Sequence, residues 1–236
     1  MSDLPIYLLS YSNPFRLLLD WSEVWATFMP ITGYFIFRRQ PHYMKPVIAY
    51  FFFALAINLA GNIIADFKRY LPYWLQSNNP LYNIHSLVRF ICYSIFFTSL
   101  GQQSFRKISY VLPVISLIIL IINFSVVENF FNPEHLSGNL LAAEAYLLLI
   151  YCMLYYLAKL SDEQDNFLKE PDFWVVTGLS IYVTANFFVF LFYVPMIYQD
   201  GKLANSMWDV HNVSYIILCI LTTKALYDSS RYQYTS

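Results

Sequence analysis

The sequence predicts an all-α membrane protein with seven transmembrane helices, the N-terminus outside the membrane and the C-terminus in the cytoplasm. The 236 residues are 58% hydrophobic and only 12% charged, whereas soluble domains carry about 25% charged residues. The mean hydropathy is +0.46. Apolar segments long enough to cross the hydrocarbon core, which takes about 20 residues, recur along the whole chain.

The expected helices are joined by short connections. They are 15–37, 46–66, 81–100, 108–127, 139–160, 173–197 and 208–227. Because they occupy most of the chain, residues 1–236 are expected to form a single membrane domain without a sizeable soluble part. No removable signal peptide is expected, since residues 1–5 lack a basic region.

The orientation follows from the basic residues, which favour the cytoplasmic ends of membrane helices. Nine of them fall at one set of expected helix ends: Arg38, Arg39, Lys45, Arg106, Lys107, Lys159, Lys169, Lys224 and Arg231. Four fall at the opposite ends: Arg16, Lys68, Arg69 and Lys202. The first set therefore marks the cytoplasmic side, and a bacterial inner (plasma) membrane is the expected location.

Composition and motifs narrow the classes of partner and activity. A net charge of −1 gives no reason to expect a nucleic-acid partner. Cys92, Cys152 and Cys219 lie within apolar segments, which is typical of buried thiols rather than of a disulfide framework. No P-loop, dinucleotide fingerprint or serine nucleophile motif occurs, so an enzyme is the less favoured class. The lipid bilayer is the expected partner, and a protein partner or a homo-oligomer stays open.

A parallel internal repeat is predicted from features that recur in the same order. His85 and His211 lie 126 residues apart in similar heptapeptides, 81–87 and 207–213. Glu23 and Glu144 each precede a basic residue by 15 positions. Pro–Asn and His follow in the same order in both halves: Pro46, Asn62 and His85, then Pro171, Asn186 and His211. The predicted organisation is 3+1+3, with repeat A at 14–107, a linker helix at 108–131 and repeat B at 132–236.

This organisation resembles the sugar-transporting SWEET and PQ-loop families, which also have two three-helix units around one linker helix and an outside N-terminus. The resemblance covers the whole chain and concerns topology. The Pro-Gln signature of those families is missing, because Gln40-Pro41 has the reverse order and lies in a loop. The resemblance therefore implies the helical arrangement and carries over neither substrate nor site residues. Parallel repeats of this kind place substrate sites near the repeat interface.

Polar residues within the expected helices indicate where a site would lie, because ionisable groups are costly in a bilayer and mark function. At 1.5 Å of rise per residue, they fall in the outer half of the membrane. They predict an outward-facing polar cavity that is capped below by apolar packing. The predicted ligand-binding residues are Glu23, Asn58, Asn62, Asp66, His85, Arg89, Glu144, Asn186, His211, Asn212 and Tyr215.

Several interpretations of these residues stay open. Arg89 is expected either to bind an anionic group, which suits its fork geometry, or to pair with Glu23, Glu144 or Asp66 as a structural ion pair. His85 and His211 are expected to be structural, to couple protons, or to bind a metal or haem together with Glu23 and Glu144. No cofactor can be assigned from the sequence.

Three functions fit these interpretations. The leading one is a small-solute transporter or ligand-binding membrane protein for a small anionic or polar ligand. The second is a receptor-like sensor that signals to a separate partner. The third is a membrane metalloenzyme or haem protein that uses His85 and His211. A retinal protein is set aside, because Lys224 lies too near the cytoplasmic end of its expected helix to carry a Schiff base.

Overall fold

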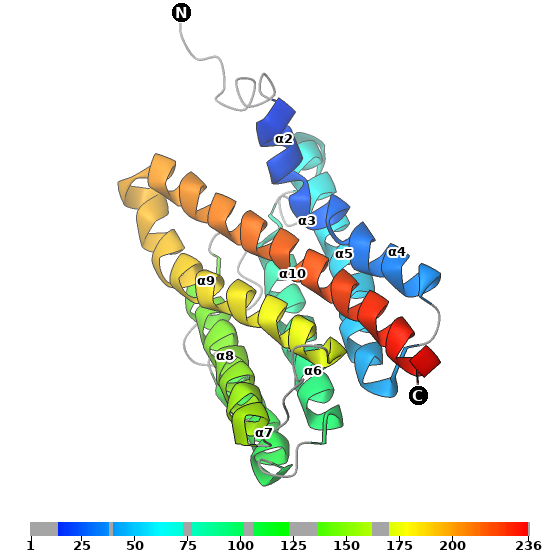
Figure 1. The fold of residues 1–236 in the computed structure, drawn as a ribbon. Helices are drawn as coiled ribbons and strands as arrows, with labels where there is room; N and C mark the ends of the chain where they lie inside the picture. The colour runs from blue at the N-terminus through cyan, green and yellow to red at the C-terminus, as the bar shows by residue number, and fades with distance from the viewer. Residues whose placement is uncertain are drawn as a thin grey trace, which may run out of the picture.

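The protein is all-α in the part of the chain that the computed structural model describes, namely residues 14–37, 40–72, 77–101, 106–122, 136–161 and 170–235. Nine α-helices are present within these residues (Figure 1). They are α2 (Pro14–Asp20), α3 (Ser22–Trp25), α4 (Phe28–Ile36), α5 (Lys45–Phe67), α6 (Asn79–Ser99), α7 (Arg106–Ile122), α8 (Gly138–Ser161), α9 (Pro171–Gln199) and α10 (Gly201–Thr235). Two 3₁₀ helices, η1 (His42–Met44) and η2 (Lys68–Tyr70), flank α5.

Four helical segments in the described residues are long and apolar enough to cross a membrane. They are His42–Tyr70, Gly138–Ser161, Pro171–Tyr193 and Gly201–Arg231. They agree with four of the expected spans, although α10 begins before 208 and extends beyond 227. The lengths and composition of these helices support an integral membrane protein.

The other three expected spans differ from this group for physical reasons. The first, 15–37, is divided into α2, α3 and α4 by breaks at Trp21 and at Ala26–Thr27. The third corresponds to α6, which contains His85 and Arg89 and is less apolar. The fourth is described only as the 17 residues of α7. The basic residues Arg38, Arg39 and Lys169 and residues 123–135 of the predicted helix, linker and second repeat lie outside the described residues.

Local sequence explains where several helices begin. A proline lies in the first turn of α5, α6 and α9, where its missing N–H would have no helical partner. Asp200 connects α9 to α10 and accepts hydrogen bonds from the backbone N–H groups of Lys202 at 3.0 Å and Leu203 at 3.2 Å. This is the chemistry of an N-cap, and it allows α9 and α10 to form an antiparallel hairpin.

The helices pack in an order that brings distant segments together. α9 packs against α8 and α10, and α10 also packs against α3 and α4. α6 packs against α5 and α8, and α7 packs against α6 and α8. Buried aromatic residues such as Tyr50, Phe51, Tyr93, Phe96 and Tyr182 fill the interior.

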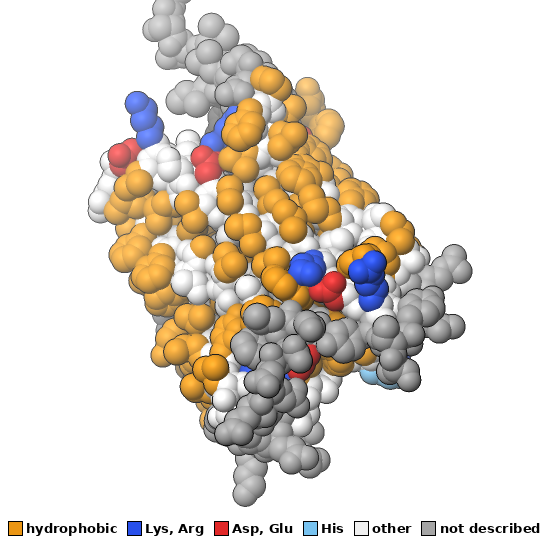
Figure 2. Space-filling model, in the orientation of Figure 1, with side chains coloured by type: hydrophobic (Ala, Val, Ile, Leu, Met, Phe, Trp, Pro, Cys, Tyr) orange, Lys and Arg blue, Asp and Glu red, His pale blue; other side chains and the backbone are white. Residues whose placement is uncertain are grey.

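The surface is largely hydrophobic. In Figure 2 hydrophobic side chains cover a broad band, and charged side chains gather toward its two ends. Leu, Ile and Phe side chains that are exposed on α5, α7, α9 and α10 make up much of this surface. In water such a patch would favour aggregation, whereas in a bilayer it is the expected lipid-facing surface.

The α9–α10 contact depends on a glycine. A Cβ atom at Gly178 would lie 3.2 Å from the Cβ of Leu221 and 3.3 Å from the Cα of Leu218. The absent side chain therefore lets the two helices approach closely, as small residues do between membrane helices.

Gly178→Val should separate α9 from α10 and lower the free energy of unfolding by about 1–3 kcal/mol, the usual cost of overpacking. The measurement is unfolding of the purified protein in mixed detergent micelles. Gly201→Ala is the control, since a Cβ atom there meets nothing within 4 Å. A stability of Gly178→Val equal to that of Gly201→Ala would contradict the close contact.

Candidate functional site

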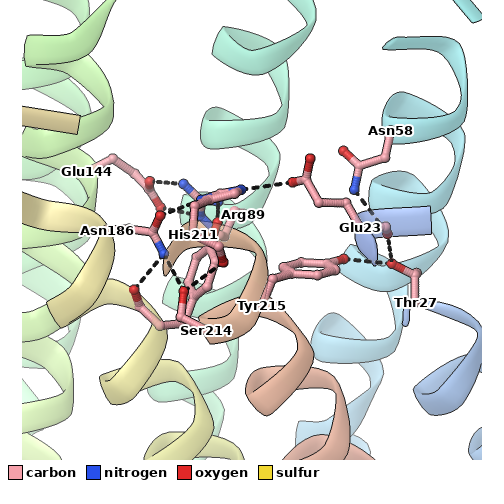
Figure 3. Close-up of polar contacts among 10 residues, drawn as sticks. Glu23, Thr27, Asn58, Arg89, Glu144, Asn186, His211, Ser214 and Tyr215 are labelled. Carbon is pink, nitrogen blue, oxygen red and sulfur yellow. Dashed lines mark hydrogen bonds and ion pairs between the residues drawn. The ribbon is translucent and has the colours of Figure 1, made fainter. Parts of the chain in front are cut away.

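Six buried polar residues form one group, the core polar cluster (Figure 3). It comprises Glu23 of α3, Arg89 of α6, Glu144 of α8, Tyr182 and Asn186 of α9, and His211 of α10. All six side chains belong to residues that are buried. Two acid–base pairs lie at its centre, Arg89–Glu144 and His211–Glu23.

The first pair joins α6 to α8. The side chains of Arg89 and Glu144 are only 3% and 0% exposed. Arg89 Nε donates to Glu144 Oε1 at 2.9 Å, and Arg89 Nη2 donates to Glu144 Oε2. This is the bidentate arrangement that gives an arginine–carboxylate pair its directional strength.

Neighbouring hydroxyls complete the first pair. Arg89 Nη1 donates to the Tyr182 hydroxyl oxygen at 2.5 Å, and the guanidinium carbon lies 5.0 Å from the centre of the Tyr182 ring. The Ser86 hydroxyl, about one helical turn before Arg89, donates to Glu144 Oε2 at 3.3 Å. The charge of Arg89 is thus met by a carboxylate, a hydroxyl and an aromatic face, which offsets the cost of burying it.

The second pair joins α10 to α3. His211 Nε2 lies 3.0 Å from Glu23 Oε1, and His211 Nδ1 is hydrogen-bonded to Asn186 Oδ1. Asn186 Nδ2 donates to the Tyr182 carbonyl at 2.7 Å and to the Ser214 hydroxyl at 3.1 Å. These two bonds identify Nδ2 as the amide donor, so Oδ1 is an acceptor.

The hydrogen bonds show that this pair holds a proton. Because Asn186 Oδ1 can only accept, His211 Nδ1 carries a hydrogen. The contact with Glu23 needs a second hydrogen, either on His211 Nε2 or on the carboxyl group of Glu23. If that proton were lost, the Nε2 lone pair would face a carboxylate and the α3–α10 contact would weaken. In this arrangement Glu23 and His211 therefore share one proton.

Secondary contacts fix the segment that carries Glu23. The Thr27 hydroxyl donates to the Glu23 carbonyl at 2.5 Å and shares a hydrogen bond of 2.7 Å with the Tyr215 hydroxyl. Asn58 Nδ2 donates to the same carbonyl at 3.4 Å. The break between α3 and α4 leaves this carbonyl without a regular helical partner. The side chains of Thr27, just before α4, and Asn58 of α5 donate hydrogen bonds to it instead.

A small cavity borders Glu23. It is lined by Glu23, Ile57, Asn58, Gly61, Asn62, Asn78, Leu81 and Tyr82 and has a volume of about 10 Å³. That is the space of about one water molecule. The cavity lies near the end of the bundle where α5 ends and α6 begins, and it is too small for a solute in this arrangement.

The structure brings most of the predicted residues together. Glu23, Asn58, His85, Arg89, Glu144, Asn186, His211, Asn212 and Tyr215 are buried. Asn62 is half-buried, and Asp66 is exposed. Of the three carboxylates considered for Arg89, Glu144 is the one it contacts. Along α5, the predicted residues therefore run from the core at Asn58 to the surface at Asp66.

The two histidines lie in different surroundings. His85 stacks on Tyr50, with ring centres 5.6 Å apart and an angle of 13° between the rings. His211 packs against Trp208 at 4.9 Å. Among the described residues no group of three or more His, Cys, Asp or Glu side chains is placed to hold a metal. Glu23 is bonded to His211 and Glu144 to Arg89, so the proposed donor set of His85, His211, Glu23 and Glu144 does not converge there.

Sequence reasoning missed the hydroxyl groups of the cluster. Ser86, Tyr182 and Ser214 were not among the predicted residues, yet each contacts one that was. A signal was present in their spacing, since Tyr182 lies one turn before Asn186 and Ser214 lies three residues after His211. Residues at such spacings share a helix face.

No protein-family model, curated protein or solved structure matches the chain. The functional conclusions therefore depend on the geometry of the site.

Loss of one member of the Arg89–Glu144 pair should leave a buried charge without its partner. Arg89→Met or Glu144→Leu alone should lower the free energy of unfolding by about 3–5 kcal/mol, and the double variant should recover a large part of that loss. The measurement is unfolding in mixed micelles.

The control for the Arg89 and Glu144 single and double variants is Asp228→Asn. It removes a partner of Lys224, whose side chain is 42% exposed, and should cost about 0.5 kcal/mol or less. Strict additivity of the Arg89 and Glu144 substitutions would show that the two side chains do not interact.

Proposed function

We propose that the protein is a proton-coupled transporter of a small polar solute, built from two three-helix halves and oriented with its N-terminus outside the bacterial inner membrane. The observation that carries this proposal is the buried Glu23–His211 pair, a proton-binding site that lies between the halves. Seven spans and the 3+1+3 repeat are part of the proposal. In it, α2–α4, α5 and α6 form one half, α7 is the linker, and α8, α9 and α10 form the other.

The pattern of helix contacts supports two equivalent halves. If the two halves are exchanged, the contact between α5 and α6 corresponds to that between α9 and α10. The contact between α4 and α5 likewise corresponds to that between α8 and α9, and all four contacts are present. The two contacts between the halves, α6–α8 and α10 with α3 and α4, are also converted into each other. Each of these contacts carries one acid–base pair, Arg89–Glu144 and His211–Glu23 respectively.

The two pairs differ in chemistry, and this difference suggests a mechanism. Arginine stays charged at any physiological pH, so the contact between α6 and α8 is permanent. The Glu23–His211 contact depends on a shared hydrogen, so the contact between α10 and α3 can open when that hydrogen is lost. The charged and titratable groups near His211 are Glu23 on α3, His85 and Arg89 on α6, and Glu144 on α8.

The solute would enter where the small cavity now lies. Asn58, Asn62 and Tyr82 line it beside Glu23, and they offer amide and hydroxyl groups for a polar molecule. Arg89 is less suited to bind an anionic solute, because its guanidinium is already directed to Glu144 and Tyr182. Opening of the α3–α10 contact would enlarge this cavity on the outer side.

A receptor-like sensor is the second candidate. The observation in its favour is that the cavity beside Glu23 has a volume of only about 10 Å³, enough for water and protons but not for a solute. In this alternative the loss of the proton would change the shape of the cytoplasmic end and alter binding of a separate protein partner. The metalloenzyme or haem hypothesis has no comparable observation in its favour.

Cysteine accessibility separates the two candidates. Asn62→Cys lines the small cavity, and Ser99→Cys lines a cavity at the opposite end of the bundle. In a transporter a change of pH should raise maleimide labelling at one site and lower it at the other. In a sensor, labelling at Asn62→Cys should stay constant. The native cysteines are buried, so they add little background.

The proposed orientation can be tested directly. Ser206→Cys should react with a membrane-impermeant maleimide in intact cells, because it is exposed near the start of α10. Ser161→Cys, exposed at the end of α8, should react only after permeabilisation. The reverse pattern would place the N-terminus in the cytoplasm.

The Glu23–His211 pair should make stability depend on pH. Because the contact needs its proton, the free energy of unfolding should fall as the pH is raised, by about 1.5–3 kcal/mol, the value of a hydrogen bond to a charged group. His211→Gln should flatten this dependence, because glutamine keeps one donor at all pH values. The measurement is thermal unfolding in detergent from acid to alkaline pH.

His42→Gln is the matched control, since His42 is exposed in η1 and should leave the profile unchanged. If His211→Gln and wild type share one profile while His42→Gln alters it, the Glu23–His211 pair is not the site of the proton.

A further inference from the structure

A set of buried polar atoms on α5, α6 and α8 lies outside the core polar cluster, and the proposed site does not use it. In the described part of the chain, His85 Nε2 and the hydroxyls of Tyr50 and Tyr93 have no hydrogen-bond partner, and the hydroxyls of Ser94 and Tyr151 have at most each other. All five residues are buried. Buried polar groups in proteins are almost always hydrogen-bonded, and internal water serves where protein groups do not.

These groups are neighbours rather than scattered. The Tyr50 ring lies between His85, at 5.6 Å, and Tyr93, at 5.3 Å. The Tyr50 hydroxyl is also within electrostatic reach of Arg89 and Glu144. His85 is in turn within reach of Glu23 and His211. Tyr50 and His85 therefore lie at the end of the set nearest the core polar cluster.

The set continues toward the other end of the bundle. Ser94 follows Tyr93 on α6, and its hydroxyl faces that of Tyr151 on α8. Tyr155 lies one turn after Tyr151, and its hydroxyl donates to Asp172 Oδ2 at 2.9 Å.

Asp172 borders a second, larger cavity. This cavity has a volume of about 390 Å³ and is lined by Pro41, Tyr43, Ser99, Leu100, Lys159, Glu170, Pro171, Asp172 and Ser229. Lys159 Nζ lies 3.5 Å from Asp172 Oδ2 and is also paired with Glu170. Asp172 thus joins the buried hydroxyls to a volume large enough for many water molecules.

We propose that these residues form a proton relay between the small cavity beside Glu23 and the large cavity beside Asp172, by way of His85, Tyr50, Tyr93, Ser94, Tyr151 and Tyr155 with internal water between them. The relay deepens the proposed function and rests on it for the proton that enters at Glu23. It gives the proton bound at Glu23 a route from one side of the bundle to the other.

Each step of the relay moves one proton and leaves the residues unchanged. A proton arrives at the Glu23–His211 pair from the outer cavity. Each hydroxyl oxygen or water molecule accepts a proton from the preceding group and passes its own hydrogen to the next. Asp172 releases the last proton to the large cavity. No tyrosine is left ionised, and no oxidant or reductant takes part.

The test is proton flux into proteoliposomes that hold a pH-sensitive dye, driven by a potassium diffusion potential. Tyr93→Phe and Tyr151→Phe keep the rings and remove the hydroxyls, and each should lower the flux at least tenfold. Tyr146→Phe is the matched control, because its ring is 53% exposed on the same helix as Tyr151, and it should conduct like wild type. Wild type without flux, or variants that conduct as well as wild type, would overturn the relay.

Thermal unfolding of the same variants gives a second readout. A hydroxyl bonded to internal water stabilises the fold, so Tyr93→Phe and Tyr151→Phe should unfold at the wild-type temperature or below it. A hydroxyl without any partner costs stability, and its removal should raise Tm. A raised Tm in both variants would show dry hydroxyls and exclude the relay.

The two proposals fail in different ways. If the pH profile of stability depends on His211 but wild type carries no proton flux, the relay is wrong and the proton-binding site stands. If Tyr151→Phe abolishes flux while His211→Gln retains the wild-type pH profile, the relay stands and the assigned proton site is wrong.

Discussion

The buried pair of Arg89 and Glu144 is the interaction on which the rest of the structure depends. A guanidinium that is 3% exposed in a bundle of apolar helices needs a carboxylate beside it, because an unpaired charge in such surroundings is very costly. This requirement sets the position of α6 along α8. Tyr182 then brings α9 to the same level through its hydroxyl bond with Arg89. Asn186 lies one turn further along α9 and is hydrogen-bonded to the His211 ring. The position of the Arg89–Glu144 pair therefore helps to fix the position of the Glu23–His211 pair.

The two buried acid–base contacts, α6 with α8 and α10 with α3, differ in chemistry. Arg89 and Glu144 make a bidentate pair of permanently charged groups. The contact between Glu23 and His211 requires a hydrogen that the two side chains share.

The interior below these pairs combines hydrophobic packing with polar function. Tyrosine rings supply the buried apolar area of a core, and each also carries one hydroxyl into it. Tyr50, Tyr93, Tyr151, Tyr155, Tyr182 and Tyr215 are all buried. A phenylalanine interior of the same shape would supply the same apolar area without these hydroxyls. The sequence-based expectation of purely apolar packing below the polar layer therefore overlooked these hydroxyls, because tyrosine counts as hydrophobic in a composition.

The sequence by itself determined the helical class, the apolar segments that became α5, α8, α9 and α10, and the burial of Glu23, Arg89, Glu144 and His211. Local chemistry suffices for these, because hydrophobic length predicts a span and a charge within it must be satisfied internally. Only the tertiary structure decided which carboxylate meets which base. Glu23, Glu144 and Asp66 were equally eligible partners for Arg89, and a single turn of helix separates a buried position from an exposed one. The choice was made by the contacts of α6 with α8 and of α10 with α3, since pairing between residues far apart in the chain depends on helix packing, which no local pattern records.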